Sequence, residues 1–243
     1  MTNEQPLPVL VLLPGLDGTG KLFTEFVEAL RSTVDCVVVA YPKDQPLGYG
    51  ELEGLVISAL PKDRSFVLLG ESFSGPLAIR IAARLPAEPP ARAPKRLVGV
   101  ILSASFAKNP YPALGWARGL AAFLPVKGLP RWLRAPLMWG SMSPSAATSK
   151  SERAMTGISA EVIRKRIEEL LRVDETLALR RVSVPILVLR AMRDRVISKR
   201  ATQVILKNSQ RAKLVEFDAP HLLLQTRAAE CAQVVVGFLQ SLT

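Results

Sequence analysis

The chain has 243 residues, of which 49% are hydrophobic and 22% are charged. This length suits one domain with a well-buried core, and this composition excludes an intrinsically disordered or fibrous protein. The formal net charge of +11 would attract an anionic partner, but it can equally serve solubility alone, which is how we interpret it.

The sequence contains no stretch near the ~20 uninterrupted apolar residues that a membrane-spanning helix requires. The first fifteen residues, MTNEQPLPVLVLLPG, lack the basic start of a signal peptide, and their apolar run leads straight into a glycine loop. Cys36 and Cys231 are expected to be buried free thiols, which suits a reducing compartment. We therefore predict a cytoplasmic protein.

Short apolar segments rich in Val, Ile and Leu alternate with helical patterns along the chain. Each segment is bounded by Gly, Pro, Asp or Ser, as is typical of strands buried on both faces. The predicted strands are Val9–Leu13, Cys36–Ala40, Phe66–Leu69, Leu97–Leu102, Ile186–Leu189 and Leu214–Phe217. The predicted helices are Leu22–Leu30, Gly50–Leu60, Ser74–Arg84, Lys199–Lys207 and Ala228–Leu239. This alternation predicts an α/β protein with a parallel sheet flanked by helices.

The alternation breaks between residues 106 and 181. That stretch begins with turns and prolines and ends in an amphipathic helix, whose apolar face holds Ile163, Ile167, Leu170 and Leu171. We interpret it as a helical cap over the carboxyl edge of the sheet, where ligands bind in such folds. The predicted core is then residues 1–105 and 182–243, with the cap (106–181) as an insertion in the same domain. Pro86–Pro94 is predicted to be an exposed loop.

A candidate nucleophile lies in Phe66-Val-Leu-Leu-Gly-Glu-Ser-Phe-Ser-Gly75, an apolar strand followed by a tight turn at Ser72 and a helix. Such a turn exposes the serine at the top of the sheet and crowds the backbone two residues before and after it. Those positions are Gly70 and Ser74; the usual pattern has glycine at both. Serine is small, so we interpret Ser74 as a mild departure.

His221 is the single histidine of the chain and follows the last predicted strand. Lone histidines are more often structural or surface residues than catalysts. A serine hydroxyl, however, needs an adjacent base, and imidazole has a suitable pKa. If Ser72 is the nucleophile, His221 is the one imidazole available to activate it. A single histidine also argues against a metal site built from thiolates and imidazoles.

A carboxylate is then needed to orient the imidazole. Asp194 lies in the loop after the predicted strand Ile186–Leu189, and the order Ser72, Asp194, His221 matches that of α/β-hydrolases. The alternative for Asp194 is a surface residue paired with a neighbouring arginine. Asp218 is closer to His221 along the chain, and we interpret it as a turn residue.

The segment Leu12-Leu-Pro-Gly-Leu-Asp-Gly-Thr-Gly20 follows the first predicted strand. Its glycines allow a tight turn that presents backbone N–H groups at the edge of the sheet. Two such donors would stabilise the oxyanion of a tetrahedral intermediate, and by position we assign them to Leu16 and Phe73. The loop has neither G-x-G-x-x-G nor the lysine–serine pair of a P-loop, which argues against a nucleotide site.

Together, the glycine loop, the Gly-Glu-Ser-Phe-Ser-Gly turn, Asp194 and Pro220-His221 resemble the α/β-hydrolase superfamily. The loop Pro-Gly-Leu-Asp-Gly-Thr-Gly resembles that of small bacterial esterases and plant acyltransferase-related hydrolases. The resemblance covers nearly the whole chain and implies a mostly parallel sheet, here of about six strands without the first two of the full fold. Where the family often has His-Gly after the first strand, this chain has Pro14-Gly15.

The predicted function is hydrolysis of a carboxylic ester through an acyl-enzyme, with Ser72, His221 and Asp194 as the catalytic triad and Leu16 and Phe73 as the oxyanion hole. Thioester hydrolysis or acyl transfer would use the same acyl-enzyme and stays an alternative. A small-molecule binding protein on a hydrolase scaffold is an alternative of another class. The substrate is expected to be a small acyl ester, with no metal, no organic cofactor and no nucleic acid.

The predicted cap is rich in tryptophan and, in its first part, in basic residues. It contains all three tryptophans, Trp116, Trp132 and Trp139, and Ala107–Lys150 has six Lys or Arg residues but no Asp or Glu. Such a surface could attract an anionic lipid or an acidic carrier such as coenzyme A. The alternative is that the aromatic rings pack under the cap and the basic groups are solvated, which we favour.

Overall fold

The computed structural model describes residues 6–85, 97–113 and 154–243. Within them, one sheet runs in the order β2-β1-β3-β4-β5-β6, and every neighbouring pair of strands is parallel. The strands are β1 (Val9–Leu13), β2 (Cys36–Val38), β3 (Phe66–Glu71), β4 (Leu97–Ser103), β5 (Ile186–Ala191) and β6 (Ala212–Phe217). The predicted parallel α/β architecture is confirmed.

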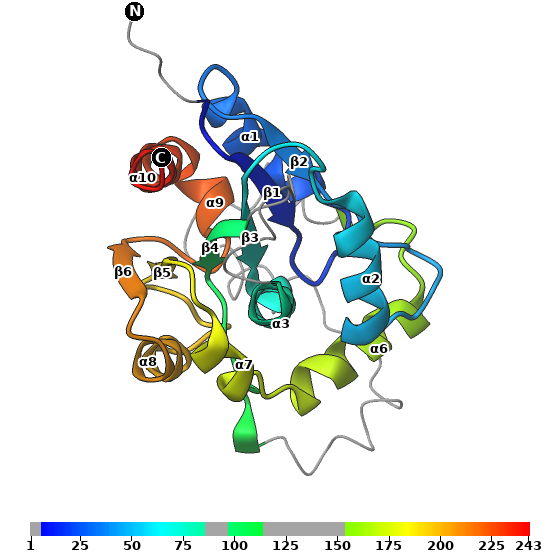
Figure 1. The fold of residues 1–243 in the computed structure, drawn as a ribbon. Helices are drawn as coiled ribbons and strands as arrows, with labels where there is room; N and C mark the ends of the chain where they lie inside the picture. The colour runs from blue at the N-terminus through cyan, green and yellow to red at the C-terminus, as the bar shows by residue number, and fades with distance from the viewer. Residues whose placement is uncertain (1–5, 86–96, 114–153) are drawn as a thin grey trace, which may run out of the picture.

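Helices cover both faces of this sheet (Figure 1). Successive side chains of a strand point to opposite faces, so Val11 of β1 packs on one side and Leu12 on the other. The side of Val11 is covered by α2 (Tyr49–Ala59), α3 (Gly75–Arg84), α7 (Thr176–Arg181) and α8 (Lys199–Asn208). The side of Leu12 is covered by α1 (Thr24–Leu30), α9 (Leu223–Thr226) and α10 (Ala228–Gln240).

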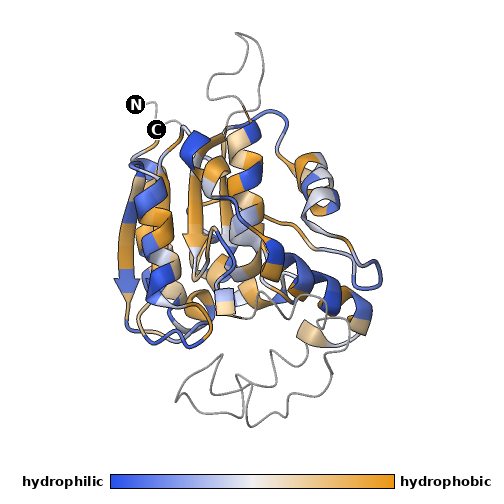
Figure 2. Cartoon of the chain, turned by 90° about the horizontal axis from the view of Figure 1, so that it is seen from below, coloured by the Kyte–Doolittle hydropathy of each residue, from blue (hydrophilic) through white to orange (hydrophobic). Residues whose placement is uncertain are grey.

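The central strands and the edge strands differ in burial. Every residue of β1 and β3 is buried, as predicted. Most residues of β2 and β6 are half-buried or exposed, so the expectation that each strand is buried on both faces is wrong at the two edges. An edge strand has a neighbour on one side only, and its outer residues therefore meet solvent. Figure 2 shows the apolar strands enclosed by helices whose outer faces are polar.

Part of the predicted cap is described. Helix α6 (Ala160–Arg172) begins at Ser159, whose side chain accepts a hydrogen bond from Val162 N–H at 3.1 Å. Its buried face differs from the predicted one, because Val162 and Arg166 are buried whereas Ile167 and Leu170 are only half-buried. The three tryptophans, the loop Pro86–Pro94 and five of the six basic residues of Ala107–Lys150 lie outside the described residues.

The boundaries of the cap stay a prediction. Helix α7 falls inside the predicted range 106–181 and packs against α3 and α8, in the helix layer of the sheet. Two short helices, η1 (Lys21–Phe23) and η2 (Ser72–Ser74), and the four-residue helix α9 were not predicted. No helix among the described residues has the length and apolar character needed to cross a membrane.

Both cysteines are free thiols. Cys231 is buried as predicted, but Cys36 is only half-buried, because it lies on the edge strand β2. Burial raises the pKa of the Cys36 thiol to about 11 and that of Cys231 to about 12. Both side chains are therefore protonated near neutral pH and are poor nucleophiles.

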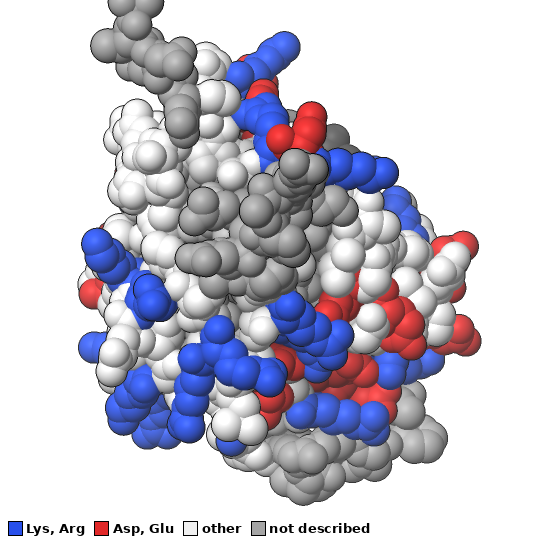
Figure 3. Space-filling view, in the orientation of Figure 1, with Lys and Arg blue, Asp and Glu red and all other residues white. Residues whose placement is uncertain are grey.

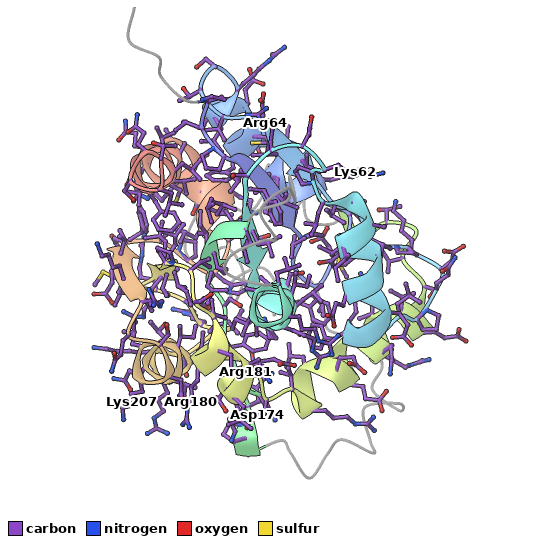
Figure 4. All side chains as sticks on the ribbon, in the orientation of Figure 1. Lys62, Arg64, Asp174, Arg180, Arg181 and Lys207 are labelled. Carbon is purple, nitrogen blue, oxygen red and sulfur yellow. The ribbon has the colours of Figure 1, made fainter. Side chains whose placement is uncertain are left out.

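Positive charge is concentrated in one part of the chain. Residues 176–215 contain ten Lys or Arg residues and a single acidic residue, Asp194. Three of these basic side chains, Arg180, Arg181 and Lys207, lie at the ends of α7 and α8, where blue atoms gather in Figure 3 and where Figure 4 labels them. These helix ends lead into β5 and β6. These three basic side chains therefore lie toward the amino edge of the sheet, opposite the edge where such folds bind ligands.

Candidate active site

Ser72 lies on a sharp turn between β3 and α3. Its φ of 48° falls in the left-handed region, which residues other than glycine seldom adopt. A Cβ atom added to Gly70 would lie 2.6 Å from the carbonyl oxygen of Ser74 and 2.9 Å from the Cα of Gly75. The turn therefore requires glycine at position 70, as the sequence pattern indicates. Ser72 itself is only half-buried, so a substrate can approach it.

Ser74 occupies the second crowded position and links two loops. Its buried hydroxyl donates to the carbonyl oxygen of Pro14, in the glycine loop. The single hydroxyl proton of Ser74 is used in this bond. The Tyr41 hydroxyl, 2.7 Å from Ser74 Oγ, must therefore donate to Ser74. The departure from glycine thus supplies hydrogen bonds that glycine could not make.

Ser72, His221 and Asp194 form a continuous hydrogen-bonded chain. Ser72 Oγ lies 3.1 Å from His221 Nε2, and His221 Nδ1 lies 2.8 Å from Asp194 Oδ2. The side chains of His221 and Asp194 are each 4% exposed. A carboxylate at Nδ1 holds the proton there and leaves the lone pair of Nε2 facing the serine. The three residues follow β3, β5 and β6 at the carboxyl edge of the sheet.

The carboxylate of Asp194 is itself held in place. Its Oδ1 accepts from the backbone N–H groups of Val196 and Ile197 at 2.7 and 2.8 Å, which leaves Oδ2 for His221. The alternative acid, Asp218, is exposed and pairs with Arg193, with Nε and Oδ1 2.7 Å apart. The structure therefore places Asp194, and not Asp218, against the imidazole.

The peptide that carries the N–H of Phe73 is fixed from its carbonyl side. The carbonyl oxygen of Ser72 accepts from Ser105 Oγ at 2.6 Å and from the N–H of Gly75. In a planar trans peptide the N–H points away from the carbonyl, so these bonds set the direction of the Phe73 N–H. The Phe73 ring stacks on Tyr49 with centroids 4.8 Å apart, and the Tyr49 hydroxyl donates to the Phe73 carbonyl at 2.7 Å.

The peptide that carries the N–H of Leu16 is fixed in the same way. The carbonyl oxygen of Gly15 accepts from the N–H of Gly18 at 3.0 Å. Among the described residues, no acceptor meets the N–H of Leu16. This turn lies beside the candidate nucleophile, because a Cβ atom on Gly15 would be 3.8 Å from the Cβ of Ser72. The two predicted oxyanion donors therefore belong to peptides whose carbonyls are both held.

Glu71 is a buried carboxyl group next to Ser72 that the sequence analysis did not single out. Burial raises its pKa to about 7, and the nearby charge of Asp17 adds to the rise. Two other interactions lower the pKa of Glu71. Gln225 Nε2 donates a hydrogen bond to Glu71 Oε1 at 2.8 Å, and His221 lies nearby. In the sequence, Glu71 could have been noticed as a carboxylate at the end of an otherwise apolar strand. No group of His, Cys, Asp and Glu in the described part of the chain could hold a metal ion.

Comparisons with known proteins identify the family and the fold. The model of the family described as "Alpha/beta hydrolase family" matches residues 10–234. A comparison with curated proteins gave no match.

Solved structures share the fold at low sequence identity. An enol-lactonase from Burkholderia xenovorans is 20% identical with a TM-score of 0.78, covering 98% of this chain and 93% of its own. An esterase from Exiguobacterium antarcticum is 14% identical with a TM-score of 0.74, and the match covers 97% of this chain and 92% of the esterase. A lipase-esterase related protein from Clostridium acetobutylicum is 14% identical with a TM-score of 0.74, and the match covers 97% of this chain and 96% of that protein.

Proposed function

The chain belongs to the alpha/beta hydrolase family, and from that premise we propose that it hydrolyses a carboxylic ester through an acyl-enzyme. Ser72 is the nucleophile, His221 the general base and acid, and Asp194 the residue that orients His221. The observation that carries the proposal is the hydrogen-bonded chain from Asp194 through His221 to Ser72, with distances of 2.8 and 3.1 Å.

In the first half of the reaction, Ser72 Oγ attacks the ester carbonyl carbon while His221 Nε2 takes the hydroxyl proton. Asp194 stabilises the imidazolium that forms. The carbonyl oxygen becomes an oxyanion, and the N–H groups of Leu16 and Phe73 are the proposed donors to it. Loss of one such donor typically lowers kcat by roughly 100- to 1000-fold. The intermediate collapses, His221 returns the proton to the leaving alcohol, and the acyl-enzyme remains.

In the second half, a water molecule attacks the acyl-enzyme with His221 as the base. The second tetrahedral intermediate expels Ser72 Oγ, which regains a proton from His221. The products are a carboxylic acid and free enzyme. A thiol leaving group, or an acceptor other than water, would use the same intermediate, so thioester hydrolysis and acyl transfer are outcomes that the test must separate.

The first test is hydrolysis of p-nitrophenyl esters of increasing acyl length by the wild type and by Ser72→Ala. The matched control is Ser58→Ala, which changes an exposed serine on α2. We expect turnover by the wild type and the control, and none by Ser72→Ala above the uncatalysed rate. Equal activity of Ser72→Ala and the wild type would contradict the proposal.

Further substrates assign the leaving group and the class of protein. Simple lactones are included because one structural relative is an enol-lactonase. Turnover of acyl-CoA thioesters but not of oxygen esters would favour the thioester alternative. Ligand binding without turnover of any substrate would favour a binding protein on a hydrolase scaffold.

We also propose a cytoplasmic location, supported by the two free thiols. Attraction of the cap to an anionic lipid or an acidic carrier was the less favoured of two alternatives, and it stays untested. Of the six Lys or Arg residues in Ala107–Lys150, only Lys108 lies within the described residues, and it pairs with Asp174 at 2.8 Å.

A further inference from the structure

Arg166 of helix α6 is a buried cation that the ester-hydrolysis mechanism does not use. It is 2% exposed and is the largest fully buried side chain in the part of the chain that the structure describes. Its Nη1 donates to the carbonyl oxygens of Leu16 and Asp17, both at 2.9 Å, and its Nη2 donates to that of Pro42 at 3.0 Å. The guanidinium also lies over the ring of Tyr41, 5.7 Å from its centroid.

This arrangement is costly for a side chain that serves packing alone. Moving a guanidinium out of water costs several kcal/mol, which good hydrogen bonds must offset. Among the described residues, Arg166 has no carboxylate within salt-bridge distance, and burial lowers the pKa of the guanidinium. An apolar side chain at this position would avoid the cost. All three hydrogen-bond acceptors of Arg166 are backbone carbonyl oxygens, and two of these carbonyls, those of Leu16 and Asp17, belong to the glycine loop.

The shape of the loop matches the guanidinium closely. Gly18 has a φ of 69°, and a Cβ atom added there would lie 2.5 Å from Arg166 Nη1. The N–H of Gly18 is the donor that holds the Gly15 carbonyl at 3.0 Å. Gly15 and Leu16 share one peptide, so a shift of Gly18 would turn the N–H of Leu16. Arg166 therefore contacts the turn at the point that sets the direction of this N–H.

We propose that Arg166 is a positioning residue, which holds the Gly15–Gly18 turn so that the Leu16 N–H is aimed at the reacting carbonyl oxygen. Stabilisation of the transition state then depends on helix α6, which belongs to the predicted cap. This inference rests on the proposed function, because the oxyanion exists only if Ser72 attacks a carbonyl group. Arg166 does not touch the substrate in this account and acts through the backbone of the loop.

The test compares Arg166→Met with Arg172→Met. Arg172 lies on the same helix, is exposed, and pairs with Glu168, so its replacement removes one arginine of α6 without touching the loop. We expect Arg166→Met to lower kcat for a p-nitrophenyl ester by roughly 10- to 100-fold, less than the loss of a whole donor, because the N–H remains but is poorly aimed. KM should change less, because the oxyanion forms after binding.

A second readout reports on the oxyanion directly. A trifluoromethyl ketone forms a tetrahedral adduct with an active serine, and its negative oxygen occupies the oxyanion hole. We expect its affinity for Arg166→Met to fall by about the same factor as kcat/KM, and Arg172→Met to bind it like the wild type. In Arg166→Ala, millimolar guanidinium ion should restore part of the lost kcat, whereas sodium ion at equal ionic strength should not.

The outcomes are distinguishable. If Arg166→Met is folded by circular dichroism and keeps wild-type kcat and ketone affinity, Arg166 is structural only and the inference is wrong. If Arg166→Met does not fold, Arg166→Lys keeps the charge and can reach fewer of the three carbonyls, so it must still lose kcat and ketone affinity. Failure of the proposed function has another signature, since the wild type would then form no ketone adduct and Ser72→Ala would match it.

Discussion

The hydroxyl group of Ser74 donates a hydrogen bond to the backbone carbonyl of Pro14 and so joins the turn of Ser72 to the glycine loop. The two residues lie 60 positions apart in the chain. The turn that carries the proposed nucleophile and the loop that carries one proposed oxyanion donor are therefore held together by a side chain, in addition to the pairing of β1 with β3.

Ser74→Ala is expected to destabilise the fold by about 1–3 kcal/mol, because the Pro14 carbonyl and the Tyr41 hydroxyl would each lose a buried partner. Urea denaturation measures the change in the free energy of unfolding. Ser58→Ala is the control, and its exposed site should bring the change within about 0.5 kcal/mol of zero. Equal stability of the two variants would show that the link between the loops contributes nothing.

Gly70→Ala is expected to unfold the protein or to abolish activity. The added methyl group would overlap backbone atoms of Ser74 and Gly75, which cannot move without opening the turn. Gly54→Ala is the matched control, because a Cβ atom at Gly54 of helix α2 meets nothing within 4 Å. Alanine there should stabilise the protein by about 0.5–1 kcal/mol. Thermal melting and ester hydrolysis, measured side by side, check both variants, and a fully active, stable Gly70→Ala would refute the account of the turn.

Asp194→Asn is expected to lower kcat by about 10,000-fold, because an amide cannot hold the imidazole in the tautomer that accepts the serine proton. Asp218→Asn should leave kcat near the wild-type value, since Asp218 is exposed and pairs with Arg193. Steady-state kinetics on one p-nitrophenyl ester decide the matter. If Asp218→Asn were the more damaging change, the acid of the triad would have to be reassigned.

Glu71 makes the stability of the protein depend on pH. Its pKa rises from the ordinary value of 4.5 to about 7 in the folded protein. The folded state therefore binds more protons than the unfolded state between these values, and the free energy of unfolding falls as pH rises through this window. Above pH 7 the buried carboxylate is ionised, and it lowers the free energy of unfolding by on the order of 3 kcal/mol for a pKa shift of this size.

Glu71→Gln removes this titration. We expect the stability of the variant relative to the wild type to increase from pH 4.5 to pH 7 and then to level off. Urea denaturation of both proteins at several pH values measures the difference. The contributions of surface carboxyl groups remote from Glu71 are common to both proteins and cancel. A difference that does not change with pH would mean that Glu71 titrates near its ordinary value.

Much of the fold follows from local patterns. The first strand was predicted at its observed bounds, and the other five were located to within two residues, because buried parallel strands are nearly continuous apolar runs. The turn of Ser72 could be recognised because a strand, a crowded glycine and a helix follow one another within ten residues. The meeting of Asp194 with His221 could be anticipated only from the order of the residues and the family resemblance.

The remaining parts of the site depend on contacts between distant segments. Arg166 was not selected from the sequence, because helical spacing marks apolar residues, and its hydrogen-bond partners lie more than 100 positions away. Ser105 and Tyr49 carry no motif, yet each holds one carbonyl beside the nucleophile. A backbone acceptor is present at every residue, so no residue type in the sequence indicates which carbonyl a side chain will meet.

The contacts from Ser72 to His221 and from Asp17 to Arg166 each span 149 positions. Ribosomes synthesise the chain from its amino end, so Ser72 and the glycine loop emerge well before His221 and Arg166, the side chains that contact them. Until His221 has emerged, Ser72 is an ordinary alcohol without a proton acceptor. A nascent chain that has not yet exposed His221 therefore carries an inert serine, and under the proposed mechanism ester cleavage begins only after β6 has paired with β5.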